Sequence, residues 1–193
     1  TLVGEIGLES GEVVAPPAAE IGYLTATSGS WAALTVAQNM DFVGGIYGLE
    51  GDALAEARTR VLERADLLDV VDRLSSQLSG GMRRKLGFSM AMMHRPPLLV
   101  LDEPSTGVDP VSRTDLWRLV SEAAASGAAV LMSTTYLDEA ERAARLLVLD
   151  HGRTLAYGTV DSVLAMLPGT VTAPTAPMRR AWSWRRGRTF HEY

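Results

Sequence analysis

The chain has 193 residues, 47% of them hydrophobic and 21% charged, which excludes wholesale disorder and fits one domain with a sizeable core. It contains no cysteine, which excludes disulfides, thiolate catalysis and Cys-based zinc sites. No apolar run is long enough for a transmembrane helix. The net charge of −5 argues against a general nucleic-acid coat, and it is uneven: residues 179–193 carry +4 and the remainder −9.

The first half of the chain is expected to be mainly helical. A short strand at 12–14 and a second strand at 21–24 are predicted to come first. The run Thr35-Val36-Ala37-Gln38 fits a capping box, which predicts a helix that starts there and ends near residue 47. Apolar residues spaced three and four apart predict another helix over about 52–68.

From Pro97 onward, short apolar runs alternate with helical segments. Strands are predicted at 98–101, 128–132, 146–149 and 154–156, and helices from Asp109-Pro110 and at 137–145 and 160–167. The first two of these strands are entirely apolar, which is typical of strands buried on both faces. The alternation predicts an α/β fold with a mainly parallel sheet.

The most specific local pattern is Leu78-Ser79-Gly80-Gly81 ahead of a helix. Two residues without Cβ atoms let a phosphate approach the backbone, and the free N–H groups of a helix start, with the Ser79 hydroxyl, form an anion site. Alone, the pattern also describes a Gly-Gly turn capped by serine. We expect a surface loop, in which Gly81→Asp removes phosphate binding and leaves the fold intact.

A second pattern is the apolar run Leu98–Leu101, which is followed at once by Asp102 and Glu103. Ligands of open α/β folds bind at the carboxyl ends of the strands. There Asp102 can hold Mg²⁺, directly or through water, and Glu103 can orient or deprotonate an attacking water. Alone, the pattern also describes a strand that ends in a solvated acidic turn.

Taken together, these two patterns closely resemble the ATP-binding cassette of ABC transporters. Residues 78–81, Leu-Ser-Gly-Gly, resemble its signature loop, 98–103 its Walker B strand and 105–109 its D-loop. The methionine after Ser-Gly-Gly and the run 136–140 look most like the ABC-2, daunorubicin-resistance-like exporter branch.

The resemblance implies a P-loop NTPase-like, three-layer α/β core with a mainly parallel sheet and an inserted α-helical subdomain. It covers about residues 1–167, with the helical signature subdomain at about 33–95, and leaves 168–193 as a Pro- and Arg-rich linker or tail. The single lysine follows no glycine, so no P-loop is present. Because the chain begins with Thr1, we expect an N-terminal truncation just after the Walker A motif, with the first strands missing.

The resemblance also implies the site residues. In this family two cassettes form a head-to-tail dimer, and each ATP lies between one P-loop and the other signature loop. The residues implied to bind ATP in trans are Ser79, Gly80, Gly81 and Met82. In the chain's own site, Asp102 is the implied Mg²⁺ ligand and Glu103 the implied catalytic residue, and Asp109 belongs to the D-loop.

Two positions depart from the family pattern. The Q-loop glutamine position is Ala26, whose methyl group cannot ligate Mg²⁺ or touch water, and the H-loop histidine position is Thr135, which is too short to reach a γ-phosphate. These residues predict weakened hydrolysis and an asymmetric pair of sites. The chain by itself is expected to be inactive, although the family is that of an ATPase.

We therefore expect the ATP-binding and ATP-hydrolysing subunit of an ABC-type exporter, which couples cassette dimerisation to a membrane permease with ATP and Mg²⁺ as cofactors. The expected partners are a second cassette, identical, different or fused, and a permease subunit, with no specific nucleic acid. The expected location is the cytoplasmic face of the membrane. The alternative is a degenerate, non-hydrolysing regulatory or ribosome-associated ABC module.

Overall fold

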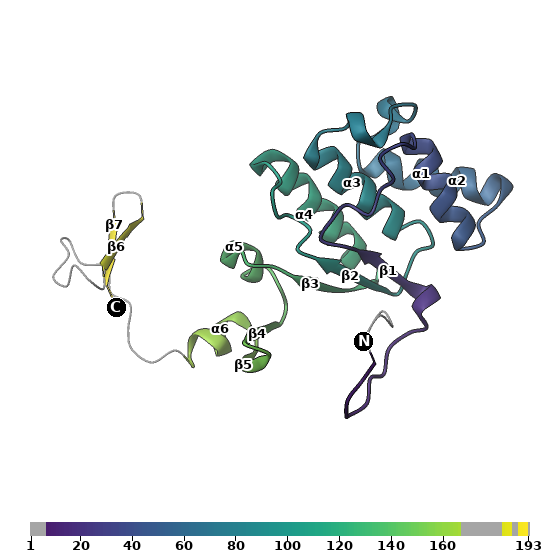
Figure 1. Cartoon of the computed structure of the whole chain (residues 1–193). Coiled ribbons are helices and arrows are strands. Elements are labelled where there is room, and N and C mark those ends of the chain that lie inside the picture. The colour runs from purple at the N-terminus through teal and green to yellow at the C-terminus, as the bar shows by residue number, and fades with distance from the viewer. Residues whose placement is uncertain (1–6, 167–182, 187–188, 193) are drawn as a thin grey trace. The chain divides into compact units, whose positions relative to one another are not determined.

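The computed structural model describes residues 7–166, 183–186 and 189–192, and the chain falls into two compact units (Figure 1). Unit 1 is Thr1–Thr135 and unit 2 is Tyr136–Tyr193. Each unit is described by itself below. None of the helices in the described residues is both long enough and apolar enough to cross a membrane.

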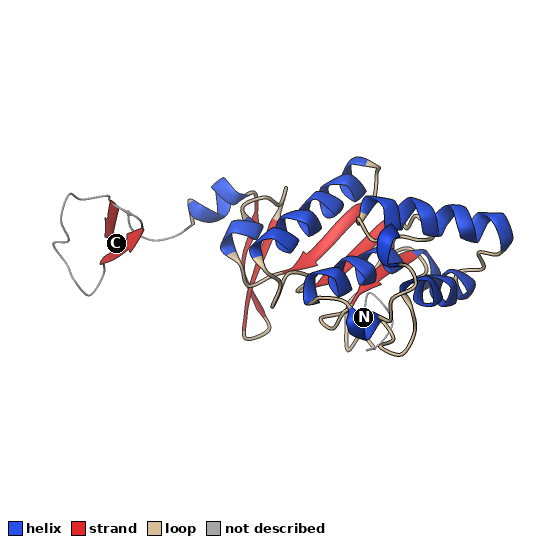
Figure 2. Ribbon diagram, turned by 90° about the horizontal axis from the view of Figure 1, so that it is seen from above, coloured by secondary structure: helices blue, strands red, loops and turns tan. Residues whose placement is uncertain are grey.

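Unit 1 is built on a parallel sheet of three strands in the order β1-β2-β3. Their bounds are β1 Ile21–Leu24, β2 Leu98–Asp102 and β3 Ala129–Ser133. Figure 2 shows the three strands side by side, with helices over them. The register pairs Leu24 with Leu101 and Asp102 with Ser133, so all three strands end at the same edge.

The helices α3 and α4 pack on this sheet, α3 against β1 and α4 against β3. In Figure 1, helices α1 to α4 lie on one side of the sheet. The expectation that 98–101 and 128–132 form strands buried on both faces is wrong. In β2, buried residues alternate with half-buried ones, and in β3 half-buried residues alternate with exposed ones such as Leu131, which is 47% exposed.

Between β1 and β2 the chain is helical, as the sequence predicts. The elements are α1 Val36–Ile46, α2 Gly51–Arg64 and α3 Gly80–Ala91, with 3-10 turns at Leu68–Val70 and Ser75–Gln77 and an earlier one at Ala18–Glu20. The predicted capping box is confirmed. The Gln38 backbone N–H donates to Thr35 Oγ1 at 3.1 Å, and the Thr35 backbone N–H donates to Gln38 Oε1 at 2.9 Å. Both bonds satisfy donors that a helix start otherwise leaves unpaired.

Helix α2 is shorter than the apolar spacing predicts. It ends at Arg64, because Asp66 takes the left-handed conformation with φ of 55°, which stops the helix. Leu68, expected on the buried face, lies in a separate 3-10 turn and is 41% exposed.

One hydrophobic core joins the helical region to the sheet. Its fully buried members include Leu24, Met40, Leu86, Leu99 and Leu116. The close crossing of α3 over β1 depends on two glycines. A Cβ on Gly22 would lie 2.4 Å from the Ala91 carbonyl oxygen, and one on Gly87 would lie 2.2 Å from the Ser28 carbonyl oxygen. The loop after β1 is therefore held directly against α3.

Helix α4, Pro110–Ala125, begins where the sequence predicts, with Asp109 as N-cap and proline in the first turn. Gly127, at φ of +100°, follows its end. The short strand expected at 12–14 is wrong, since those residues carry no regular structure.

Unit 2 contains small elements. They are α5 Leu137–Ala140, β4 Leu146–Asp150, β5 Arg153–Gly158, α6 Val160–Leu164, β6 Ser183–Arg186 and β7 Thr189–Glu192. The expected helices 137–145 and 160–167 are both shorter, and residue 167 lies outside the described residues. The expected third and fourth strands form, but they pair with each other as an antiparallel hairpin, as do β6 and β7. The expected linker or tail, 168–193, covers residues 168–182, which lie outside the described residues, and the hairpin of β6 and β7.

Candidate functional site

The acidic pair sits at the carboxyl edge of the sheet, as the sequence predicts. Asp102 is the last residue of β2 and Glu103 follows it. The Ser133 hydroxyl, from the end of β3, donates to Asp102 Oδ1 at 2.7 Å and accepts from the Glu103 amide at 2.8 Å. Ser133 therefore fixes both acids at once. Sequence reasoning gave Ser133 no role at the site, because these contacts join residues 30 and 31 positions apart.

Glu103 adopts a left-handed conformation with φ of 42°, which is unusual for a residue other than glycine. Its carboxylate Oε2 accepts from the Thr106 hydroxyl at 2.7 Å. Both acids are partly exposed. The carboxylates are thus anchored by neighbouring hydroxyls and reachable by a ligand.

A third residue of this edge comes from α3. The buried Arg84 donates through Nη1 to the Thr25 carbonyl at 3.0 Å and through Nη2 to the Ala26 carbonyl. Burial lowers the pKa of Arg84, and the charges of Asp102 and Glu103 oppose that lowering. A fixed positive charge therefore lies near the acidic pair. The sequence signal for it is that Arg84 shares a helix face with Gly87, the residue that lets the 25–28 loop approach.

The two departures from the family pattern lie at the same edge. Ala26 follows β1 and Thr135 follows β3, and both are exposed. Ala26 contributes a backbone carbonyl that Arg84 already engages. The carboxyl edge therefore carries an acidic pair, a bound arginine and two small side chains.

The Ser-Gly-Gly loop forms the start of α3. The Ser79 hydroxyl caps the helix by accepting from the Met82 amide at 3.2 Å. Gly80 is exposed, and a Cβ there would have nothing within 4 Å. Gly81 is buried, and a Cβ there would lie 2.1 Å from Ser112 Oγ on α4. The expectation that Gly81→Asp leaves the fold intact is therefore wrong.

Asp109 joins this loop to α4. Its Oδ1 accepts from the Val111 amide at 3.1 Å and from the Ser112 amide at 3.0 Å. Hydrogen bonds from Ser112, first backbone and then side chain, lower the pKa of Asp109. The carboxylate lies 3.3 Å from where a Cβ of Gly81 would be. Asp109 therefore acts in this structure as a helix cap beside the loop.

A small pocket of about 220 Å³ lies between these segments. Gly80, Arg83 and Arg84 line one side of it, and residues 106–108 line another. The described residues contain no cluster of three or more His, Asp or Glu that could enclose a metal by themselves.

Residues 3–106, more than half of the chain, match the sequence model of the ABC transporter family. The chain belongs to this family. It is 36% identical over 159 residues to the probable multidrug ABC transporter ATP-binding protein YbhF of Escherichia coli K12. This match covers 82% of the chain and 28% of that protein. It is 42% identical over 142 residues to the daunorubicin/doxorubicin resistance ATP-binding protein DrrA of Streptomyces peucetius. This match covers 72% of the chain and 42% of that protein.

A solved structure of an ATP binding subunit of an ABC transporter resembles this ABC chain with a TM-score of 0.68 at 28% identity, over 77% of this chain and 62% of that one. The expected family and α/β fold are confirmed. The chain spans less than half the length of the two curated relatives. The roles of the individual site residues stay predictions.

Proposed function

We propose that this chain is the ATP-binding and ATP-hydrolysing part of an ABC exporter subunit. The main observation in support is the acidic pair Asp102–Glu103, which Ser133 holds at the carboxyl edge of a parallel sheet. Relatives named as a multidrug ABC transporter ATP-binding protein and as a daunorubicin/doxorubicin resistance ATP-binding protein support the exporter class. They do not favour the alternative of a regulatory or ribosome-associated module.

In the chain's own site, Asp102 is the proposed Mg²⁺ ligand. Mg²⁺ in nucleotide sites is held by one or two carboxylates together with substrate phosphates, and the partly exposed Asp102 fits that requirement. When bound, the ion supplies compensation for the negative charge of the phosphates. Ser133 orients the Asp102 carboxylate toward the edge through its 2.7 Å bond.

Glu103 is the proposed catalytic residue. Its role is to orient a water, or to accept its proton, for in-line attack on the γ-phosphate. Ser133 fixes its backbone and Thr106 holds one carboxylate oxygen, so the group is positioned before substrate arrives. Arg84 supplies positive charge near the same edge. With Ala26 and Thr135 at the two family positions, we expect slow hydrolysis.

The Ser-Gly-Gly loop is the proposed contact to ATP held by a partner cassette. Ser79 caps α3, and Gly80, Gly81 and Met82 begin this 12-residue helix, whose early N–H groups favour an anion. Gly80 is exposed at the mouth of the 220 Å³ pocket, beside Arg83. Gly81 instead lets the loop pack on α4, and Asp109 caps that helix.

The proposed contact to the permease is an apolar patch formed by α1 and the segment before it. Trp31 and Phe42 pack edge-to-face with ring centroids 4.6 Å apart, and Ile46 lies one helical turn beyond Phe42. They are 43%, 49% and 65% exposed. Exposed apolar clusters of this kind commonly mark protein interfaces. The proposed location is peripheral, at the cytoplasmic face of the membrane.

A mixing experiment tests the proposed role in trans. The chain is added to a hydrolysis-competent ABC cassette, and the ATPase rate and complex size are measured. We expect Gly80→Asp to remove any stimulation and any ATP-dependent complex, because it places a carboxylate beside the partner's phosphate. Gly45→Asp is the matched control, since Gly45 also has nothing within 4 Å of a Cβ. Equal behaviour of both variants contradicts the trans role.

A further inference from the structure

A second cavity lies at the opposite end of the sheet from Asp102. Its volume is about 480 Å³, within the range of small-molecule sites. Pro97 and Ala128, which precede β2 and β3, line it, so it lies at the amino-terminal edge. The site proposed for ATP lies at the carboxyl edge, so this cavity is separate from it.

Three helices of unit 1 end at this cavity: Arg64 of α2, Met92 after α3 and Ser126 after α4 line it. The last carbonyls of a helix carry partial negative charge. Two arginine side chains already donate hydrogen bonds to carbonyls near these helix ends. Arg60 Nη2 donates to the Met93 carbonyl at 2.8 Å, and Arg118 Nη2 donates to the Arg64 carbonyl at 2.7 Å.

Arg118 also holds the acid in the cavity wall, because its Nη1 bonds Glu122 Oε1 at 2.6 Å. The guanidinium groups of Arg64 and Arg95 are the two that remain available to a ligand. Arg95 approaches Glu56 only to 3.8 Å, and these side chains are 68% and 78% exposed, so the pair is weak. Among the residues that the structure describes, no ion pair involves Arg64.

The three cavity arginines repel one another. The pKa of Arg60 is lowered first by burial and then by the charges of Arg95 and Arg64, with Glu56 opposing. An anion placed among these groups relieves that repulsion. Guanidinium groups present paired N–H donors that match the two oxygens of a carboxylate.

The floor of the cavity is apolar. Val61, Phe88 and Leu119 line it, all of them buried. The hydroxyl of Ser89 is directed to the Val61 carbonyl at 3.4 Å. A cavity with an apolar floor and a cationic rim complements a ligand that has an apolar body and one anionic end.

We propose that this cavity binds a small organic carboxylate. The apolar body lies against Val61, Phe88 and Leu119, and the carboxylate lies between Arg64 and Arg95. The binding is independent of nucleotide, because no residue of the carboxyl edge takes part.

Calorimetric titration of the full chain tests this, with benzoate as the probe. Benzamide, the neutral isostere, and inorganic phosphate, which has no apolar body, are the comparison probes. We expect saturable benzoate binding, at least about tenfold tighter than either comparison probe, since a charge-assisted bond contributes that much. The double variant Arg64→Gln/Arg95→Gln is expected to lose at least about tenfold in affinity.

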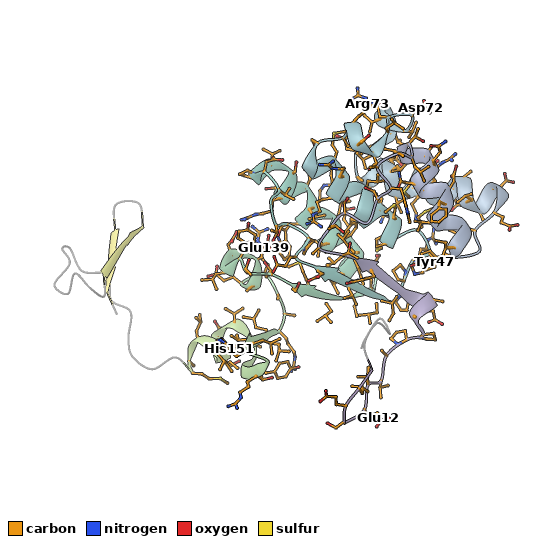
Figure 3. The ribbon with its side chains drawn as sticks, viewed as in Figure 1. Glu12, Tyr47, Asp72, Arg73, Glu139 and His151 are labelled. Atoms are coloured by element: carbon orange, nitrogen blue, oxygen red, sulfur yellow. The ribbon has the colours of Figure 1, made fainter. Side chains whose placement is uncertain are left out.

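Arg73→Gln is the matched control, since it removes the same charge at an exposed position that Figure 3 shows at the outer surface of the helical region. It is expected to bind benzoate as the unmodified chain does. No saturable benzoate binding, an equal loss in Arg73→Gln, or phosphate binding as tight as benzoate overturns the proposal. Far-ultraviolet circular dichroism confirms that the variants, changed only at exposed side chains, remain folded.

Discussion

At the scale of single residues, His94 is an ionisable group packed as an aromatic one. Its ring stacks on Tyr47, labelled in Figure 3, at 3.6 Å between centroids and 13° between planes. Within the described residues neither ring nitrogen has a hydrogen-bond partner. Burial lowers the pKa of His94 below its usual value of 6.5. The folded state therefore favours the neutral ring.

This makes stability depend on pH in a defined direction. Because the folded-state pKa is below the unfolded one, the stability contribution is present above pH 6.5 and is lost as pH falls through the lowered folded value. We expect His94→Phe, which keeps the stack on Tyr47, to flatten the fall in unfolding free energy between about pH 7 and 5. Urea unfolding across this range measures it, and parallel curves for His94→Phe and the unmodified chain contradict it.

Arg84 is predicted to stabilise the loop after β1. Arg84→Met leaves the Thr25 and Ala26 carbonyls without their donors, and we expect a loss of about 2 kcal/mol in unfolding free energy. Arg83→Met, at the exposed neighbouring position, is the control and should change it by less than about 0.5 kcal/mol. Chemical denaturation compares the two, and equal small losses would show that the Arg84 contacts contribute nothing.

At the scale of elements, the approach of α3 to the 25–28 loop is the most constrained contact. Gly87→Ala places a Cβ 2.2 Å from the Ser28 carbonyl oxygen, and backbone cannot move aside cheaply, so we expect a loss of about 1–3 kcal/mol. Gly45→Ala, in open space on α1, should be neutral or stabilising by up to about 1 kcal/mol. Thermal unfolding of both variants decides, and a neutral Gly87→Ala contradicts the close packing.

The elements that sequence predicted well are those with local signals. The caps at Thr35 and Asp109 depend on residues within three positions, so both helix starts were correct. The end of α2 was wrong because apolar spacing continues to Leu68 while Asp66 turns the backbone. The burial of β3 was wrong because an apolar run does not say how many layers cover a strand.

The residues of the candidate site also differ in whether a local sequence signal predicts them. Asp102, Glu103 and the Ser-Gly-Gly loop were found because each is a contiguous motif. Ser133 and Arg84 were missed, although they hold the acids and the loop after β1. Their contacts join residues 30 to 60 positions apart, and only the fold brings such positions together.

At the scale of the whole molecule, Ala26 and Thr135 predict a site with weakened chemistry. In a chain preceded by the P-loop segment of an ABC cassette, we expect Ala26→Gln together with Thr135→His to raise ATP turnover. Losing one positioned group near developing charge commonly costs on the order of 10²–10³-fold. Steady-state phosphate release measures this. A flat rate in the double variant means that these positions do not limit the chemistry.

The most direct measurement is ATP turnover by that same P-loop-bearing chain with and without Glu103→Gln. Glu103 is anchored at its backbone amide by Ser133 and at its carboxylate by Thr106, so glutamine retains the shape and removes the charge that we propose activates water. We predict measurable turnover in the unmodified chain, none above background in Glu103→Gln, and none in the 193-residue chain alone. Turnover that survives Glu103→Gln would contradict the claim that this carboxyl edge hydrolyses ATP.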